Sequence, residues 1–194
     1  MVSTRPIEVE VKLPVQADRV AGLCARLEAL AARRLNEEDH EDIYFAHPTR
    51  SFAQTDEALR LRKRIPVDAT VPVPLPQLTY KGPKLDKTTK TRQESTVEVS
   101  NSESLLEILE SLGFRRMGTV RKHRVFYDLD GTVVSLDRVD QVGTFVEVEM
   151  IARDESEVPR ARERVFTVIK SLNLNPADSV RESYLELLLA RMGE

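Results

Sequence analysis

Charged and apolar side chains alternate strictly along residues 7–13, and this pattern is the first indication of a functional site in the chain. In a β-strand, successive side chains point to opposite faces, so Glu8, Glu10 and Lys12 share one face and the four apolar residues share the other. A strand on the surface of an antiparallel sheet shows the same pattern. The later segments of the chain decide between these interpretations.

The alternation returns in several later segments that are also typical of strands. Their charged positions on one strand face are Arg60, Arg62 and Arg64, then Arg92, Glu94 and Glu98, then Lys122 and Arg124, then Asp137, and finally Glu147 and Glu149. Amphipathic helices are available to cover the apolar faces of such a sheet. The charged faces can all turn inward only if the sheet closes on itself, so we predict an α+β protein built on a closed β-barrel with a charged lumen.

Carboxylates are contributed by the first strand and by the last two strands. They are Glu8, Glu10, Asp137, Glu147 and Glu149. If they converge, ligation entirely by oxygen suits a hard divalent cation such as Mg²⁺ or Mn²⁺. Without a cation, carboxylates packed together repel one another, and their pKa values rise.

Cationic side chains come mainly from the strands in the middle of the chain. They are Lys12, Arg60, Arg62, Lys81, Arg92, Lys122 and Arg124. Arginine offers forked, bidentate donors and lysine a point charge, and together these groups match a polyphosphate chain. The ligand predicted for the lumen is therefore a metal-bound triphosphate.

Ordinary cross-strand salt bridges are the alternative explanation for any one of these pairs, each worth a few tenths of a kcal/mol at a surface. They do not explain the whole set well, because each unpaired buried ion costs several kcal/mol. A functional site accounts for the set better than stability does.

The remaining elements follow from periodicity and turn residues. We expect helices at residues 16–34, 102–112, 157–172 and 178–191, and strands at 42–45, 78–81, 91–99 and between 120 and 152. Gly113 should end the second helix, and Asp130 with Gly131 should form a two-residue hairpin turn. Residues 47–56 are expected to be a polar loop, and the prolines of residues 66–76 predict an extended connection.

The composition is that of an ordinary globular protein, and we expect residues 1–194 to form a single domain. There are 29 basic and 32 acidic side chains, for a net charge of −3, so the overall charge gives no reason to expect nucleic acid as a partner. The single cysteine, Cys24, excludes an internal disulfide and fits a reducing compartment. Without a long apolar run or a signal peptide, we expect a cytoplasmic protein that does not bind membranes.

An ordered series of motifs covers nearly the whole chain. Glu8-Val9-Glu10-Val11-Lys12 resembles the ExExK signature of the CYTH superfamily, the triphosphate tunnel metalloenzymes. The resemblance continues through Leu59-Arg60-Leu61-Arg62, Leu78-Thr79-Tyr80-Lys81-Gly82-Pro83, Lys122-His123-Arg124, Leu136-Asp137-Arg138-Val139 and Glu147-Val148-Glu149. It implies an eight-stranded antiparallel closed barrel, called a triphosphate tunnel, flanked by helices.

The family resemblance also implies roles for individual residues. Glu8, Glu10, Glu147 and Glu149, with Asp137, would bind the divalent metal, and the seven cationic residues given above would hold the triphosphate, Arg92 less clearly than the others. Within the superfamily, the chain looks most like class IV adenylate cyclases of the CyaB type. The implied reaction converts ATP into 3′,5′-cyclic AMP and pyrophosphate, with Lys12, Lys81 and Arg124 as the catalytic cations. A homodimer is the state that the family suggests.

Hydrolysis of tripolyphosphate, thiamine triphosphate or a nucleotide is the competing interpretation, because the same metal and basic residues would serve it with water as the nucleophile. A binder of polyphosphate without turnover is the third.

Several other residues receive structural interpretations. His123 should point away from the lumen, and His40 and His47 should lie in loops, so none is expected to be catalytic. Lys84, Lys87 and Lys90 are interpreted as a solvated loop rather than a lid over the tunnel mouth, and Phe45, Phe126 and Tyr184 as core residues rather than groups that stack on adenine.

Overall fold

The computed structural model describes residues 7–85 and 89–193. The strands are β1 (Ile7–Val15), β2 (Arg33–Ala46), β3 (Ala58–Pro66), β4 (Gln77–Lys81), β5 (Arg92–Glu98), β6 (Arg115–Leu129), β7 (Thr132–Val139) and β8 (Gly143–Ala152). The helices are α1 (Val20–Ala29), α2 (Phe52–Thr55), α3 (Ser102–Ser111), α4 (Val158–Ser171) and α5 (Tyr184–Met192), with short 3₁₀ turns η1 (Ala17–Arg19) and η2 (Pro176–Asp178).

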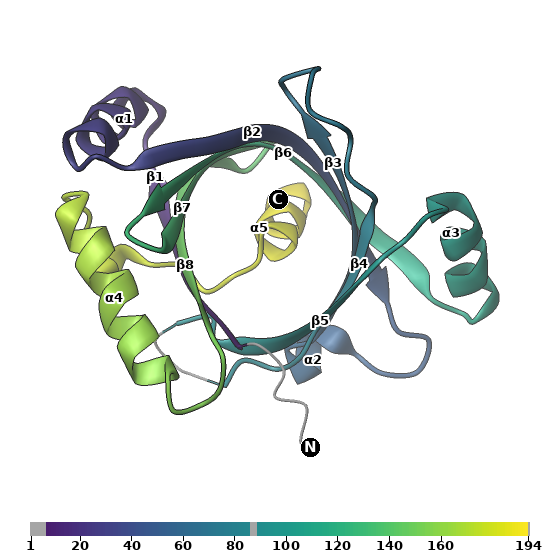
Figure 1. The fold of residues 1–194 in the computed structure, drawn as a ribbon. Coiled ribbons are helices and arrows are strands. Elements are labelled where there is room, and N and C mark those ends of the chain that lie inside the picture. Colours follow the sequence, from purple (N-terminus) through teal and green to yellow (C-terminus); the bar gives the residue numbers. More distant parts are fainter. Residues whose placement is uncertain (1–6, 86–88, 194) are drawn as a thin grey trace.

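The eight strands close into one barrel in the order β1-β5-β4-β3-β2-β6-β7-β8, and every neighbouring pair is antiparallel (Figure 1). In this order β2 lies across the barrel from β1, so side chains from the first two strands face each other over the lumen. The predicted closed antiparallel barrel with flanking helices is confirmed.

The apolar faces of the strands point outward and are covered by helices. Ile7, Val9 and Val11 of β1 pack in one cluster with residues of α1 and α4 such as Leu27 and Val165. A second cluster joins β2 and β3 to α3. No helix in the described part of the chain is long and apolar enough to cross a membrane. The core therefore lies between the barrel and its helices, which leaves the inside of the barrel to polar groups.

The last helix, α5, takes a different position and packs across one end of the barrel. Tyr184, Leu185 and Leu188 are buried in a cluster with residues of β2, β6 and β8, and Figure 1 shows the helix over the barrel opening. Gly118 of β6 permits this close approach, because a Cβ there would meet Leu185 Cδ1 at 2.9 Å. The α5 helix thus brings the first residues of its N-terminal turn to the lumen.

Several of the expected element boundaries were wrong. The first helix ends at Ala29 instead of residue 34, because Ala31 takes a positive φ of 56° and the chain turns into β2. The β2 strand is 14 residues long, far beyond the expected residues 42–45, and β6 begins at Arg115. Charged residues on both faces of residues 33–41 hide the alternation there.

Smaller differences concern the loops and the last helix. The expected polar loop contains the short helix α2, and α5 starts at Tyr184 instead of residue 178. The hairpin turn was predicted correctly, since Asp130 and Gly131 have φ values of 50° and 76°. Gly113, with a φ of 87°, follows α3 as expected.

Candidate active site

The lumen contains a cavity of about 300 Å³ that is lined by alternate residues of seven strands. The predicted site residues that line it are Glu8, Glu10, Lys12, Arg60, Arg62, Lys81, Arg92, Lys122, Arg124, Glu147 and Glu149. Of the predicted site residues, Asp137 is the one outside this lining. The inward direction of these side chains is a consequence of register, since β1 pairs with β8 so that Glu10 faces Glu149 and Lys12 faces Glu147.

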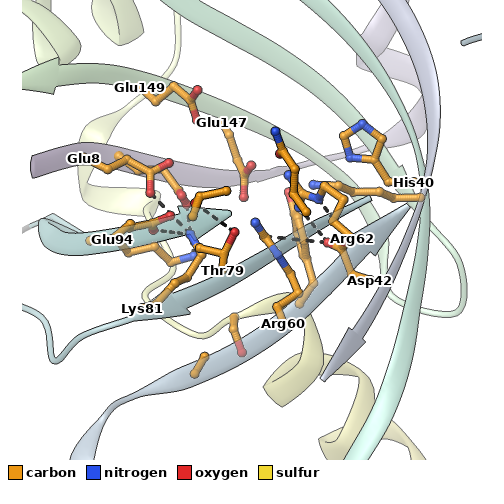
Figure 2. Close-up of a pocket in the computed structure, with 18 of the residues that line it drawn as sticks. Glu8, His40, Asp42, Arg60, Arg62, Thr79, Lys81, Glu94, Glu147 and Glu149 are labelled. Atoms are coloured by element: carbon orange, nitrogen blue, oxygen red, sulfur yellow. Dashed lines mark hydrogen bonds and ion pairs between the residues drawn. The ribbon is translucent and has the colours of Figure 1, made fainter. Parts of the chain in front are cut away.

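Carboxylates of β1, β5 and β8 gather on one side of the lumen, and the arginines of β3 lie on the other. Figure 2 shows Glu8, Glu94 and Glu149 together, with Arg60 and Arg62 across the cavity from them. This separation of charge follows from the strand order, because β1, β5 and β8 are neighbours in the barrel, and β3 lies away from them.

Glu8, Glu10 and Glu149 form the tightest acidic group, with one ligand oxygen from each lying within 4.8 Å of the others. Burial and the negative charge of Glu8 raise the pKa of Glu149 to about 8. The pKa of Glu94 is also raised, to about 7, by burial and by its contact with Glu8. Hard oxygen donors at this separation fit a divalent cation such as Mg²⁺ or Mn²⁺, which would relieve their repulsion.

Lys81 lies beside this acidic group. Its Nζ is 3.3 Å from Glu8 Oε2, and it also donates a short hydrogen bond to Glu94. Burial alone would raise the pKa of Glu8, but the Lys81 charge holds it below the usual range. Lys81 therefore keeps one carboxylate of the group ionised.

Asp137 and Glu147 lie deeper, around the guanidinium of Arg124. Asp137 is fully buried and accepts from Arg124 Nε at 2.5 Å, from Lys122 Nζ at 3.2 Å and from the Tyr184 hydroxyl at 2.8 Å. Glu147 forms a short contact with the same Arg124. Asp137 is therefore not among the grouped carboxylates, since cationic and hydroxyl donors surround it, whereas Glu147 lines the cavity between Arg124 and the acidic group.

Lys122 shares this centre and lines the cavity. Burial, together with the positive charge of Arg124, lowers its pKa to about 8, while Asp137 works in the opposite direction. Its ammonium lies 5.0 Å from the centroid of the Tyr184 ring, so α5 contributes directly to the environment of the basic residues.

The arginines of β3 are held by Asp42, which was not among the predicted site residues. Arg62 donates two hydrogen bonds of 2.6 Å to Asp42, and Arg60 lies 3.8 Å from it. Burial opposes ionisation of Asp42, but Arg62 and Arg60 keep its pKa below the usual range. The β2–β3 register, which pairs Asp42 with Arg62, makes this contact.

Lys12 is completely buried at the end of the lumen that α5 covers. Its Nζ donates to the carbonyl of Glu182 and lies 4.1 Å from the centroid of the Tyr184 ring. Burial and the neighbouring charge of Lys90 lower the pKa of Lys12 to about 6.

Lys90 does not lie in a solvated loop, so its expected position was wrong. It is buried, lines the cavity, and its Nζ is 3.1 Å from Glu10 Oε1. Lys84 of the same connection turns away from the lumen and pairs with Asp56 at 2.5 Å. Lys87 lies outside the described residues. Loops have no periodicity, so the sequence does not show which of these lysines points into the lumen.

His40 is a strand residue and not a loop residue, so its expected position was wrong. It lies in β2, lines the cavity, and its Nε2 is 2.7 Å from Glu38 Oε2. Burial lowers its pKa to about 4, against the opposing effect of the Glu38 contact. His123 does point away from the lumen, toward Glu37 and Asp39.

The aromatic residues divide between the core and the lumen. Phe45 packs in the core with α3, as expected. Phe126 lines the cavity, where the carbon centre of the Arg124 guanidinium lies 5.4 Å from the centroid of its ring. Tyr184 lines the cavity as well as packing in the core, so both residues were only partly described by the core interpretation.

The comparisons with known proteins agree with this geometry. The CYTH domain model matches residues 6–184. A protein of Methanocaldococcus jannaschii named "Putative adenylate cyclase MJ0240" is 35% identical over 92% of this chain and 98% of its own length. "Adenylate cyclase CyaB" of Aeromonas hydrophila is 25% identical over 93% of this chain and 87% of its own length.

A solved structure has nearly the same fold. The PH1819 protein of Pyrococcus horikoshii OT3 superposes with a TM-score of 0.85 and 35% identity, covering 95% of this chain and 99% of the other. The family model matches most of the sequence, and the barrel has the closed antiparallel form that the motifs implied. We conclude that the chain belongs to the CYTH domain family.

Proposed function

We propose that the protein is a metal-dependent adenylate cyclase that converts ATP into 3′,5′-cyclic AMP and pyrophosphate. CYTH enzymes act on triphosphates and depend on a metal ion. The observation that carries the proposal is the division of the lumen into an acidic side and a basic side around one cavity. The choice of ATP cyclisation is supported by two relatives that carry the name adenylate cyclase.

The metal would be held by Glu8, Glu10 and Glu149, whose ligand oxygens already lie together. Glu147 lines the cavity beside Arg124 and would join them. When bound, Mg²⁺ or Mn²⁺ neutralises phosphate oxygens and lowers the pKa of a coordinated hydroxyl. Asp137 is better assigned to positioning Arg124 and Lys122, because all of its described partners are donors from the basic residues and Tyr184.

The triphosphate would lie among the basic residues that line the lumen. The residues proposed to bind it are Lys12, Arg60, Arg62, Lys81, Arg92, Lys122 and Arg124. Arg62 and Arg124 are oriented by bidentate contacts to Asp42 and Asp137, so little side-chain freedom is lost when phosphate binds.

In the proposed reaction, the ribose 3′-hydroxyl releases its proton to water and its oxygen attacks the α-phosphorus. The bond from that phosphorus to the bridging oxygen breaks, and pyrophosphate leaves. Holding the chain of phosphates in line with the ribose is the main task of the lumen. Lys81 and Arg124 would stabilise the charge that moves onto the leaving pyrophosphate, and Lys12 would do so in its protonated form.

The test is to incubate the purified protein with ATP, or separately with tripolyphosphate, in Mg²⁺ or Mn²⁺ and to resolve the products by chromatography. Cyclic AMP and pyrophosphate in equal amounts are expected from ATP, and EDTA should abolish them. Orthophosphate without cyclic AMP would overturn the cyclase assignment and identify a triphosphatase. Glu98→Gln is the matched control for losses at the metal carboxylates, because Glu98 is an exposed β5 residue outside the cavity.

A further inference from the structure

Lys90 is a buried lysine that reaches the lumen from the connection between β4 and β5, not from a strand. Its side chain is 10% exposed, and its Nζ lies 3.1 Å from Glu10 Oε1. A buried ammonium is costly unless it is paired, and here a carboxylate of the acidic group is its partner. A role as a merely solvated charge is therefore excluded.

The backbone around Lys90 is fixed, so its side chain is directed into the lumen. Lys90 N donates to the carbonyl of Glu10 at 2.9 Å, which extends the contact between β5 and β1 beyond the end of β5. The hydroxyls of Thr89 and Thr91 are 2.6 Å apart, and both residues are buried. Leu85 N donates to the carbonyl of Thr91 at 2.7 Å, which ties the two ends of the connection together.

The pairing of Lys90 with Glu10 conflicts with a metal ion on the same carboxylate. Glu10 is one of the three grouped carboxylates, so a divalent cation there would face the Lys90 ammonium as a like charge. A phosphate bound to that metal would supply the negative charge that the ammonium then needs. Lys90 lines the same cavity as the residues proposed to bind the triphosphate, so its side chain faces the space that the triphosphate would occupy.

We propose that Lys90 is a further triphosphate-binding residue that pairs with Glu10 until a metal-bound triphosphate enters, and then exchanges that carboxylate for a phosphate oxygen. This inference rests on the proposed function only insofar as the lumen binds a metal-bound triphosphate. It is independent of whether the later chemistry is cyclisation or hydrolysis.

Two binding measurements on Lys90→Gln test the exchange, because they should change in opposite directions. Without nucleotide, Mn²⁺ should bind about three-fold to ten-fold more tightly, because a like charge near Glu10 has been removed. With Mn²⁺ present, imidotriphosphate, whose bridging nitrogens resist hydrolysis, should bind about ten-fold more weakly, because a charge-assisted hydrogen bond has been lost. Isothermal titration calorimetry measures both affinities.

Matched variants separate this role from a structural one. Lys84→Gln removes one charge from the same connection but outside the cavity, so neither affinity should change. Lys90→Arg keeps the charge and should restore most of the imidotriphosphate affinity. If Lys90→Gln leaves both affinities unchanged, or weakens both together, the inference is overturned. If the wild-type protein itself does not bind imidotriphosphate with Mn²⁺, the proposed function fails instead.

A labelling experiment on the wild-type protein does not depend on a variant that folds. Modification of Lys90 by an amine-reactive reagent, followed by mass spectrometry, should increase when Mn²⁺ alone is added, because the metal displaces the ammonium from Glu10. Adding imidotriphosphate with Mn²⁺ should suppress the modification below both levels. Equal modification of Lys90 in all three conditions would overturn the inference.

Discussion

Carboxylates in the lumen differ in what surrounds them, and the difference predicts different effects of substitution. Glu149 is buried among Glu8, Glu10 and Glu147, and its burial together with their charges raises its pKa. Asp137 lies among Arg124, Lys122 and Tyr184, and its pKa is lowered by the two cations in spite of its burial. Glu149 is therefore held among carboxylates that repel it, whereas Asp137 is the anion that neutralises the basic group of Arg124 and Lys122.

We predict that Glu149→Gln abolishes metal-dependent turnover but raises thermal stability in EDTA. Between about pH 4.5 and about pH 8, folded Glu149 retains a proton that the unfolded chain has released. The free energy of unfolding therefore falls as pH rises through this window, and the substitution removes that dependence because an amide does not titrate. The melting temperature of the variant should exceed that of the wild type by a margin that grows from pH 6 to pH 8.

The control for this prediction is Glu98→Gln, which should melt like the wild type at every pH. A margin that shrinks as pH rises would contradict the raised pKa of Glu149. Turnover retained in millimolar Mg²⁺ would remove Glu149 from the metal site.

Asp137→Asn should have the opposite effect on stability. It leaves two buried cations, Arg124 and Lys122, without their carboxylate, which costs roughly 3–5 kcal/mol in comparable buried pairs. Urea denaturation measures this loss. Glu41→Gln is the comparison, because its pair with Arg121 on the outside of the barrel is partly exposed and worth at most about 1 kcal/mol. Equal losses in both variants would contradict the structural role of Asp137.

Strand alternation predicted most residues of the lumen, since the direction of a side chain in a strand is a local property of the sequence. Glu8, Arg60 and Arg124 were found in this way. His40 was missed because charged residues occupy both faces of residues 33–41, and Asp42 because it is the single charged residue in the expected strand 42–45. Lys90 was missed because its direction depends on a backbone hydrogen bond to Glu10, a residue 80 positions away.

At the scale of elements, the first turn of α5 contributes both to the stability of the fold and to the geometry of the site. Ser183 caps this helix through a capping box with Glu186, in which Glu186 N donates to Ser183 Oγ at 3.1 Å and Ser183 N donates to Glu186 Oε2 at 2.6 Å. The next residue, Tyr184, contacts Asp137 and lies over Lys12. The first turn of α5 therefore sets the position of groups that line the cavity.

We predict that Ser183→Ala lowers stability by about 1 kcal/mol, the usual value of an N-cap, and also raises the apparent KM for the triphosphate. The matched control is Asn101→Ala at the start of α3, where the Asn101 side chain accepts from Ser104 N at 3.0 Å. The α3 helix packs on the outside of the barrel, so this control should lose similar stability without a change in KM. A change in KM of equal size in both variants would contradict the specific role of α5.

The positions of helices in the chain were predicted better from the sequence than the way in which the helices pack on the barrel. Apolar spacing in α3 and α4 gave their positions within two residues at either end. The placement of α5 across one end of the barrel was not predictable, because it depends on packing against residues of β2, β6 and β8, which are far away in the chain. The long β2 and β6 strands were underestimated, since their outer halves pair with each other where both faces carry charges.

At the scale of the whole molecule, a net charge of −3 conceals a strong internal separation of charge. The arginines of β3 and the acidic group of β1 and β8 lie on two sides of one closed barrel. Neither a metal ion nor a triphosphate alone balances both sides. A metal bound to a triphosphate balances them together, so the two ligands should stabilise the fold cooperatively.

We therefore predict that Mn²⁺ and imidotriphosphate together raise the melting temperature by more than the sum of their separate effects. At about 100 times its dissociation constant, a ligand adds about 2.7 kcal/mol, which corresponds to roughly 5–11 °C for a chain of this size. Differential scanning fluorimetry at fixed protein concentration measures the shifts. Glu149→Gln should reduce the combined shift to that of imidotriphosphate alone, because the anion still meets the basic side while the metal lacks one of its carboxylates. Additive shifts in the wild-type protein would mean that the two sides of the lumen act independently, and would contradict a metal-bound triphosphate as the ligand.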